Sequence, residues 1–265
     1  SSVPRDHSPL TVEAYVDEPC DALPPLREPA LLFNEHRAGV VGADWLSFGA
    51  AVASADRRGV VCLWDASAAQ VIARTKMPTD ESVVNERCAL DNDVYTPGGG
   101  SSVLHVEGGC SQPLFAVSSR TGRAVMWDAR SMSQPALSLA AHEGACSSSS
   151  LTKLEDNVLV TAGDDRNVRV WDLRHTATAR VTAKVGATPH RIAVSCNGLV
   201  AVPCEDKRTR VIDVSGHKRA KLRHEDKVGH KSVVTSSCWS SDESVLFTSG
   251  WDSSVKAWWA VGSQA

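Results

Sequence analysis

The sequence predicts an all-β protein made of five copies of one repeating unit, and two observations support this. Five segments share one layout, in which two strand-like runs are joined by a turn rich in polar residues. The anchor residues that end the second run, 63, 44, 41 and 46 residues apart, are Trp64, Trp127, Trp171, Ile212 and Trp258. Periods of about 20 to 50 residues are typical of architectures in which neighbouring units share a core.

The composition fits a globular domain and argues against several classes of partner. With 42% hydrophobic and 22% charged residues, the 265-residue chain can bury a large core. Its formal net charge of -3 does not favour nucleic acid as a partner of the whole chain. No run approaches the roughly 20 apolar residues that span a bilayer, and the N-terminus lacks the apolar core of a signal peptide. We therefore expect no membrane insertion.

The eight cysteines are spread along the chain and never form a C-x-x-C pair. This spacing indicates neither a zinc site nor a disulfide framework, so we expect no metal and no cofactor. Reduced thiols are typical of a cytoplasmic protein. Because the chain does not begin with methionine, we also expect a fragment or a processed form.

The long first interval predicts an insertion. Residues 77–102 contain Pro, Gly and acidic residues where the other repeats have an alternating pattern, and we expect a mobile loop there. Residues 1–29 form a Pro-rich, acidic N-terminal segment. The repeat domain then covers residues 30–265.

Two repeats contain four polar residues at nearly constant spacing. A histidine is followed by a threonine 19 or 18 residues later, an aspartate four residues after that, and a tryptophan six residues further on. The two sets are His142, Thr161, Asp165, Trp171 and His230, Thr248, Asp252, Trp258. A buried hydrogen-bond network needs such fixed spacing, because each polar group must find its partner without water. The period and these tetrads resemble the WD40-repeat family, which implies a β-propeller.

The first repeat departs from this tetrad at one position. It has His36, Ser54 and Trp64 at the expected spacing. Arg58, however, stands at the aspartate position, and Asp56 comes two residues early. The sequence leaves the network of this repeat in doubt.

The second and fourth repeats depart further. The second has Val117 at the hydroxyl position and Thr121 at the aspartate position. The fourth keeps Asp206 but has Val202 and Ile212 in place of the hydroxyl and the tryptophan. We expect these two blades to depend on apolar packing.

The strand count leaves two propeller arrangements open. The last repeat ends at an inner strand, so its blade lacks an outermost strand. The run PALLFNEH, residues 29–36, reads as a lone strand that could fill this place and close a five-bladed ring. The alternative is an open arc of a larger propeller with an exposed edge. In either case Trp45 and Trp239 lie in first-strand patterns and are expected to pack.

The sequence contains no G-x-S-x-G, H-E-x-x-H or P-loop glycine pattern, so we expect no enzyme. The resemblance implies instead a non-catalytic scaffold or adaptor whose turns bind other proteins. The residue before the turn aspartate should project from one face, and in the five repeats it is Arg57, Arg120, Asp164, Glu205 and Trp251. Trp251 is the strongest candidate, because interface hot spots are rich in Trp and Arg.

Two further sequence patterns suggest other functions or binding surfaces. Arg130 and Arg174 lie in W-D-x-R motifs, which resemble those of substrate receptors of cullin-4 ubiquitin ligases. Each arginine could also simply pair with the aspartate two residues before it. Residues 207–231 form a basic flank that could attract an acidic protein segment, whereas nucleic acid is disfavoured because exposed aromatics are not interleaved.

The fourth repeat carries a closer resemblance. Its run HRIAVSCNGLVAVPCEDKRTRVIDVSGHKRAKL, followed by GHKSVVTSSCW, resembles the C-terminal half of one subfamily of WD40 proteins. That resemblance implies association with phosphofurin acidic cluster sorting adaptors and a link to calcium handling at the endoplasmic reticulum. It also implies a location in both cytoplasm and nucleus.

Overall fold

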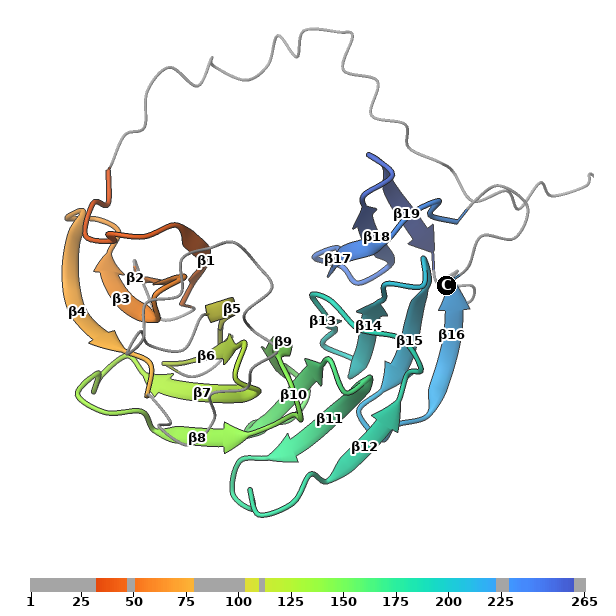
Figure 1. Cartoon of the computed structure of the whole chain (residues 1–265), viewed down its shortest axis with the longest axis horizontal. Helices are drawn as coiled ribbons and strands as arrows, with labels where there is room; N and C mark the ends of the chain where they lie inside the picture. Colours follow the sequence, from red (N-terminus) through yellow and green to blue (C-terminus); the bar gives the residue numbers. More distant parts are fainter. Residues whose placement is uncertain (1–31, 47–50, 79–102, 110–112, 223–228, 260–265) are drawn as a thin grey trace, which may run out of the picture.

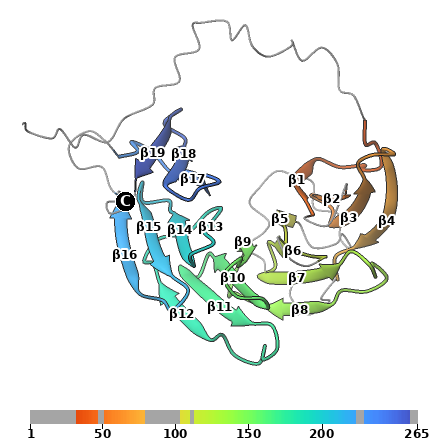
Figure 2. The same cartoon turned by 180° about the vertical axis from the view of Figure 1, so that it is seen from behind.

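The five predicted repeats form five antiparallel sheets in the computed structural model, which describes residues 32–46, 51–78, 103–109, 113–222 and 229–259. Within these ranges the chain has nineteen strands and no helix. The sheets stand side by side like blades around a central space, and together they form an arc (Figures 1 and 2). The predicted all-β propeller fold is confirmed, and the described residues do not form a closed ring.

Each blade is made of strands that are consecutive along the chain, with the first strand nearest the central space. Blades 1 and 2 contain β1 (Val40–Trp45), β2 (Ala51–Asp56), β3 (Val60–Asp65), β4 (Gln70–Lys76), β5 (Val103–Gly108), β6 (Leu114–Ser119), β7 (Arg123–Asp128) and β8 (Leu137–Ala140). Blades 3 and 4 contain β9 (Cys146–Leu151), β10 (Val158–Gly163), β11 (Asn167–Asp172), β12 (Val181–Lys184), β13 (Ala193–Val194), β14 (Leu199–Pro203), β15 (Thr209–Asp213) and β16 (Lys218–Leu222). Blade 5 contains β17 (Val234–Trp239), β18 (Val245–Gly250) and β19 (Val255–Trp259).

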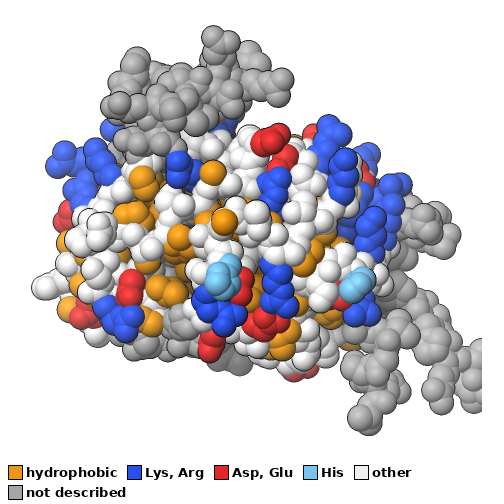
Figure 3. All heavy atoms as spheres, turned by 90° about the horizontal axis from the view of Figure 1, so that it is seen from below, with side chains coloured by type: hydrophobic (Ala, Val, Ile, Leu, Met, Phe, Trp, Pro, Cys, Tyr) orange, Lys and Arg blue, Asp and Glu red, His pale blue; other side chains and the backbone are white. Residues whose placement is uncertain are grey.

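The turn between the second and third strands has one backbone feature in common in every blade. One residue in each of these turns has a positive φ, and the five are Gly59, Gly122, Arg166, Lys207 and Ser253. A side chain at such a φ costs roughly 1–2 kcal/mol, so the turn is imposed by the strands that it joins. The outer strands lie on the outside of the arc, where charged side chains of both signs are interspersed with hydrophobic ones (Figure 3).

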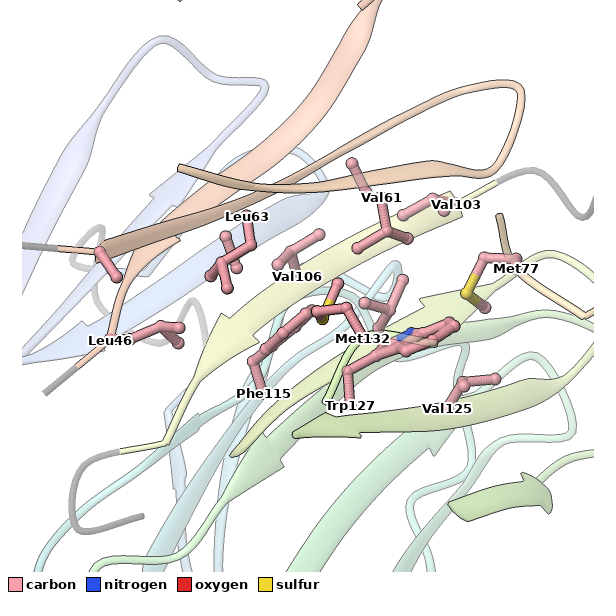
Figure 4. Packing of buried hydrophobic residues seen from close by; sticks show 14 residues of the cluster. Leu46, Val61, Leu63, Met77, Val103, Val106, Phe115, Val125, Trp127 and Met132 are labelled. Atoms are coloured by element: carbon pink, nitrogen blue, oxygen red, sulfur yellow. The ribbon is translucent and has the colours of Figure 1, made fainter. Parts of the chain in front are cut away.

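The core lies between neighbouring blades. Phe115 and Trp127 of blade 2 are at most 1% exposed and pack against side chains of blade 1 such as Leu63 (Figure 4). Similar clusters join blade 2 to 3, blade 3 to 4 and blade 4 to 5. Each inner blade therefore buries both of its faces, and its middle strands are buried along nearly their whole length, as in β6 and β10.

Among the residues that the structure describes, the two ends of the arc do not meet (Figures 1 and 2). The last sheet has three strands, and β19 pairs only with β18 among the described residues. The prediction of a strand at residues 29–36 is wrong for residues 32–36, which form no strand with any other described residue; residues 29–31 lie outside the described ranges. The physical reason is that no strand of blade 5 lies within their reach, and Phe33 packs against Trp64 instead.

The expectation that Trp45 and Trp239 pack is confirmed for one residue and wrong for the other. Trp239 is partly buried and its Nε1–H donates to the Ala193 carbonyl at 3.2 Å, as expected of a packing residue. Trp45 is 62% exposed, so the expectation that it packs is wrong. It lies on the face of blade 1 that has no neighbouring blade, which the sequence pattern alone does not reveal. The N-terminal segment 1–29 and residues 79–102 of the predicted insertion lie outside the described residues.

Candidate functional site

The polar tetrad of blade 3 is a continuous chain of hydrogen bonds. The indole Nε1–H of Trp171 donates to Thr161 Oγ1 at 2.9 Å, and this hydroxyl lies 2.9 Å from His142 Nε2. His142 Nδ1 lies 2.8 Å from Asp165 Oδ1. With a neutral ring, each group donates to the next: indole to hydroxyl, hydroxyl to Nε2, and Nδ1–H to carboxylate.

Blade 5 repeats this arrangement. Trp258 Nε1–H donates to Thr248 Oγ1 at 2.9 Å, and His230 Nε2 lies 2.8 Å from the same oxygen. His230 Nδ1 is 3.0 Å from Asp252 Oδ1. Asp252 also accepts the Lys231 amide at 2.8 Å, so one carboxylate joins the turn to the segment that enters the blade.

Electrostatics holds the blade 3 network in one protonation state. Burial is the main cause that lowers the pKa of His142, which favours the neutral ring. Burial opposes ionisation of Asp165, but the His142 ring and the Arg169 guanidinium outweigh it and keep the pKa of this carboxyl below its usual value. Arg169 lies 2.8 Å from Asp165 Oδ2 and also donates to the Ala141 carbonyl.

A glycine two residues after the hydroxyl makes room for the histidine ring. A Cβ added to Gly163 would lie 2.3 Å from the His142 ring, and one added to Gly250 would lie 2.9 Å from His230 Nδ1. Either contact is far inside van der Waals distance. The glycine is thus part of the network, although the tetrad pattern in the sequence does not include it.

Blade 1 completes its network in a different way. Asp56 occupies the place of the glycine, and its Oδ2 lies 3.2 Å from His36 Nδ1. Ser54 Oγ is 2.7 Å from both His36 Nε2 and Trp64 Nε1. Asp56 Oδ1 accepts two turn amides, at 2.9 and 3.0 Å. The network that the sequence left in doubt is therefore complete, because a carboxylate from a neighbouring position reaches the same histidine.

Blade 2 has no such network among the described residues. Trp127 is 1% exposed, and its Nε1 has no hydrogen-bond partner in the part of the chain that the structure describes. Val117, at the hydroxyl position, is fully buried. Thr121 instead bonds the hydroxyl of Ser119 at 2.9 Å. Apolar packing of Trp127 against Phe115 and its neighbours takes the place of the tetrad.

In blade 4, Val202 and Ile212 are buried in the cluster that faces blade 3. The carboxylate of Asp206 forms a bidentate ion pair with Arg210, in which Nη1 lies 2.9 Å from Oδ1 and Nη2 lies 2.6 Å from Oδ2. This ion pair holds the turn through a residue of the same hairpin. In the tetrad blades, by contrast, a histidine from the segment before the blade holds the turn.

The predicted partner-binding residues occupy equivalent places on one rim of the arc, called here the upper rim. They are Arg57, Arg120, Asp164, Glu205 and Trp251, one in each turn between the second and third strands. In four of the five turns the backbone N–H of this residue donates to the loop that enters the same blade, at 2.9 or 3.0 Å. Each of these four turns is therefore tied by a backbone hydrogen bond to the loop that enters its own blade.

The charges of the upper rim interact across blades. Burial raises the pKa of Asp164, and the nearby His190 and Arg120 oppose this. Burial lowers the pKa of His190, against the attraction of Glu205 and Asp164. The sequence analysis missed His190, because it lies in the loop before blade 4 and belongs to no repeat position. Trp251 is 73% exposed.

The W-D-x-R arginines both bind their own aspartates. Arg130 Nη2 lies 2.7 Å from Asp128 Oδ2, and Arg174 Nη2 lies 2.8 Å from Asp172 Oδ2. Their side chains are 73% and 66% exposed, so each guanidinium still presents donors to solvent.

The predicted basic flank is only partly described, because residues 223–228 lie outside the described ranges. Lys218 and Lys221 are exposed on β16, the outer strand of blade 4. Arg219 is paired with Asp213 at 2.8 Å, so part of its charge is already neutralised within the chain. In the described ranges, no cluster of three or more His, Cys, Asp or Glu could hold a metal ion, and no helix is long and apolar enough to cross a membrane.

Comparisons with known proteins agree with this architecture. The model of the WD domain, G-beta repeat, matches residues 133–172 and 222–258, and these two ranges contain the two complete tetrads. WD repeat-containing protein 37 of Homo sapiens is 28% identical over 239 residues, which cover 89% of this chain and 44% of that protein. The chain thus spans less than half the length of this relative.

Two other matches point to the same fold. A ribosome biogenesis protein WDR12 homolog of Culex quinquefasciatus is 26% identical over 240 residues, covering 84% of this chain and 54% of that protein. Among solved structures, a chain of the crystal structure of the mitotic checkpoint complex superposes with a TM-score of 0.66 at 18% identity. That match covers 85% of this chain and 63% of the other.

Replacing tryptophan by phenylalanine separates the two kinds of blade. Trp171→Phe should cost about 1–3 kcal/mol more than Trp127→Phe, because it leaves the Thr161 hydroxyl without its donor, whereas the Trp127 indole N–H has no described partner to lose. Both changes remove the same volume, so each controls for the other. Urea unfolding of the two variants measures the difference, and equal losses would contradict the network account.

The stability of the protein should fall in two steps as the pH is lowered. The lowered pKa of His142 means that the unfolded chain takes up its proton more readily, so stability falls as the pH drops below about 6.5. The lowered pKa of Asp165 adds a further loss as the pH drops below about 4. His142→Gln should be less stable at pH 7 but less sensitive between pH 7 and 5. The same slope in both proteins over that interval would show that His142 does not titrate on unfolding.

Proposed function

We propose that this chain, a WD40-repeat protein related to WD repeat-containing protein 37, is a non-catalytic scaffold that binds other proteins through its upper rim. The observation that supports this most strongly is that the equivalent turn residue is held in the same way in four of the five blades. In four blades the same backbone N–H donates to the entering loop, so these side chains project from a rigid frame. Because this surface is already ordered, binding of a partner there costs little conformational entropy.

The partner that we propose is a phosphofurin acidic cluster sorting adaptor, with a role in calcium handling at the endoplasmic reticulum. The support is the likeness to WD repeat-containing protein 37, which extends over 89% of this chain. This partner requires the chain in the cytoplasm, and we propose the nucleus as a second location. The proposed contact residues are Arg57, Arg120, Asp164, Glu205 and Trp251.

Trp251 should contribute most to this interaction. Trp251→Ala should weaken binding of the sorting adaptor by about 2 kcal/mol or more, because a 73% exposed indole is available to fill a pocket of the partner. The matched control is Ile72→Ala, which removes a 57% exposed apolar side chain from β4 on the outer strand of blade 1. Titration calorimetry measures both. Unchanged affinity in Trp251→Ala would place recognition away from the upper rim.

A second candidate function is that of a substrate receptor of a cullin-4 ubiquitin ligase. The observation that favours it is that adjacent blades present equivalent exposed arginines, Arg130 and Arg174. Under this hypothesis the double change Arg130→Ala and Arg174→Ala should abolish co-purification with the ligase adaptor and leave binding at Trp251 unaffected. Retention of the ligase adaptor by the double variant, or its absence from the parent protein, would exclude this role.

A further inference from the structure

The outer strand of blade 4 carries a concentration of basic side chains. Residues 206–221 contain six Lys or Arg and two Asp, in a chain whose formal net charge is -3. Within this stretch β16 reads KRAKL, and its first four residues are exposed. The strand lies on the outside of the arc (Figure 1), and basic side chains gather on that side of the molecule (Figure 3). Blade 4 therefore presents positive charge to solvent along its outer strand.

The register of the sheet places three of these basic residues on one face. Lys221 lies opposite Arg210, and Lys218 lies opposite Ile212, two residues further along β15. Residues opposite each other in an antiparallel pair share a face, so Arg210, Lys218 and Lys221 lie on the same one. Ile212 is buried in the cluster between blades 3 and 4, which identifies this as the face of blade 4 that is turned toward blade 3.

The carboxylates beside this face are already occupied by arginines. Both oxygens of Asp206 accept from Arg210, and Asp213 lies 2.8 Å from Arg219 Nη2. Within the described ranges neither lysine of β16 forms an ion pair. Asp206 thus offsets one of three positive charges on this face. Like charges on neighbouring positions of a sheet repel one another, so an anion bound between the two lysines would relieve that repulsion.

We propose that this face of β16 binds an acidic segment of another protein in an extended conformation. The two β16 lysines lie opposite β15 residues that are two positions apart, so they are spaced by about 6.8 Å along the strand. Alternate side chains of an extended peptide have the same spacing, and an E-x-E pattern therefore aligns one carboxylate with each lysine. Because both lysines are exposed, the contact is sensitive to salt.

A nucleic acid fits this face less well than an acidic peptide does. β15 and β16 contain no aromatic residue on which bases could stack. The formal net charge of -3 on the whole chain opposes the approach of a long polyanion more than that of a short acidic segment. The surface is also separate from the upper rim, because it lies on an outer strand and not on the turns between the second and third strands.

Charge reversal on two outer strands tests the proposal. Lys218→Glu with Lys221→Glu reverses the proposed site, and both side chains are exposed, so the fold should be spared. Arg74→Glu with Lys76→Glu is the matched control on β4, where two exposed basic side chains also share one face of an outer strand. Both variants keep the strand edge charged and so keep its protection against aggregation. Circular dichroism and thermal melts check the fold. Should the β16 variant melt lower, Lys218→Gln with Lys221→Gln takes its place.

Fluorescence anisotropy of the full chain at low salt measures binding of a labelled peptide of alternating glutamate and serine. The parent and the β4 variant should bind this peptide, and the β16 variant should bind it at least about ten-fold more weakly. A peptide with the same glutamates in one block should bind the parent less tightly, because its carboxylates do not match the spacing of the lysines. Trp251→Ala should bind the alternating peptide as the parent does, whatever its effect at the upper rim.

Four results would each overturn the proposal. The first is a parent protein that does not bind the alternating peptide, and the second is an equal loss in the β16 and β4 variants. The third is equal affinity for the alternating and the block peptide. The fourth is tighter binding of single-stranded oligothymidylate than of the peptide, abolished in the β16 variant, which would assign the face to nucleic acid.

Discussion

The architecture depends on a single hydroxyl in each of three blades. Ser54, Thr161 and Thr248 each accept an indole N–H and lie within hydrogen-bond distance of a histidine Nε2. Because these atoms are buried, water cannot replace any missing partner, and each loss would leave a polar group unsatisfied. The hydroxyl therefore ties the third strand to the loop that enters the blade, and that loop in turn fixes the turn on the upper rim.

Blades with and without this network alternate along the arc. The tetrad tryptophan of blade 3 packs against blade 2, and that of blade 5 against blade 4. Trp127 of blade 2 packs in the same direction, against blade 1, but through apolar contacts. Apolar packing thus holds the interfaces between blades, and at two of these interfaces the packed tryptophan also belongs to a hydrogen-bonded tetrad. At the two ends of the arc a blade face or strand edge has no neighbour within the described ranges, and there apolar side chains such as Trp45 and Trp259 are exposed.

The sequence predicted those features that local spacing determines. The hairpins and the tetrads of blades 3 and 5 each lie within one repeat, so the residue intervals were sufficient to predict them. Asp56 was not assigned to its network, because its role depends on the backbone position that glycine holds in blades 3 and 5. His190 was missed because loops bring it beside Asp164 and Glu205, which lie in different repeats. Closure of the ring depends on contacts between distant segments, and periodicity carries no information about these.

The protonation pattern of the three network histidines tests the account most directly. If each hydroxyl donates to Nε2, then His36, His142 and His230 must be neutral and carry their proton on Nδ1, which points to Asp56, Asp165 and Asp252. Long-range ¹H–¹⁵N correlation spectra of the imidazole rings at pH 7 distinguish the two neutral tautomers from the charged ring. The account predicts three rings with Nδ1–H and an unprotonated Nε2. Protonated Nε2 in these rings would contradict it, because the chain of donors from tryptophan to aspartate could not then exist.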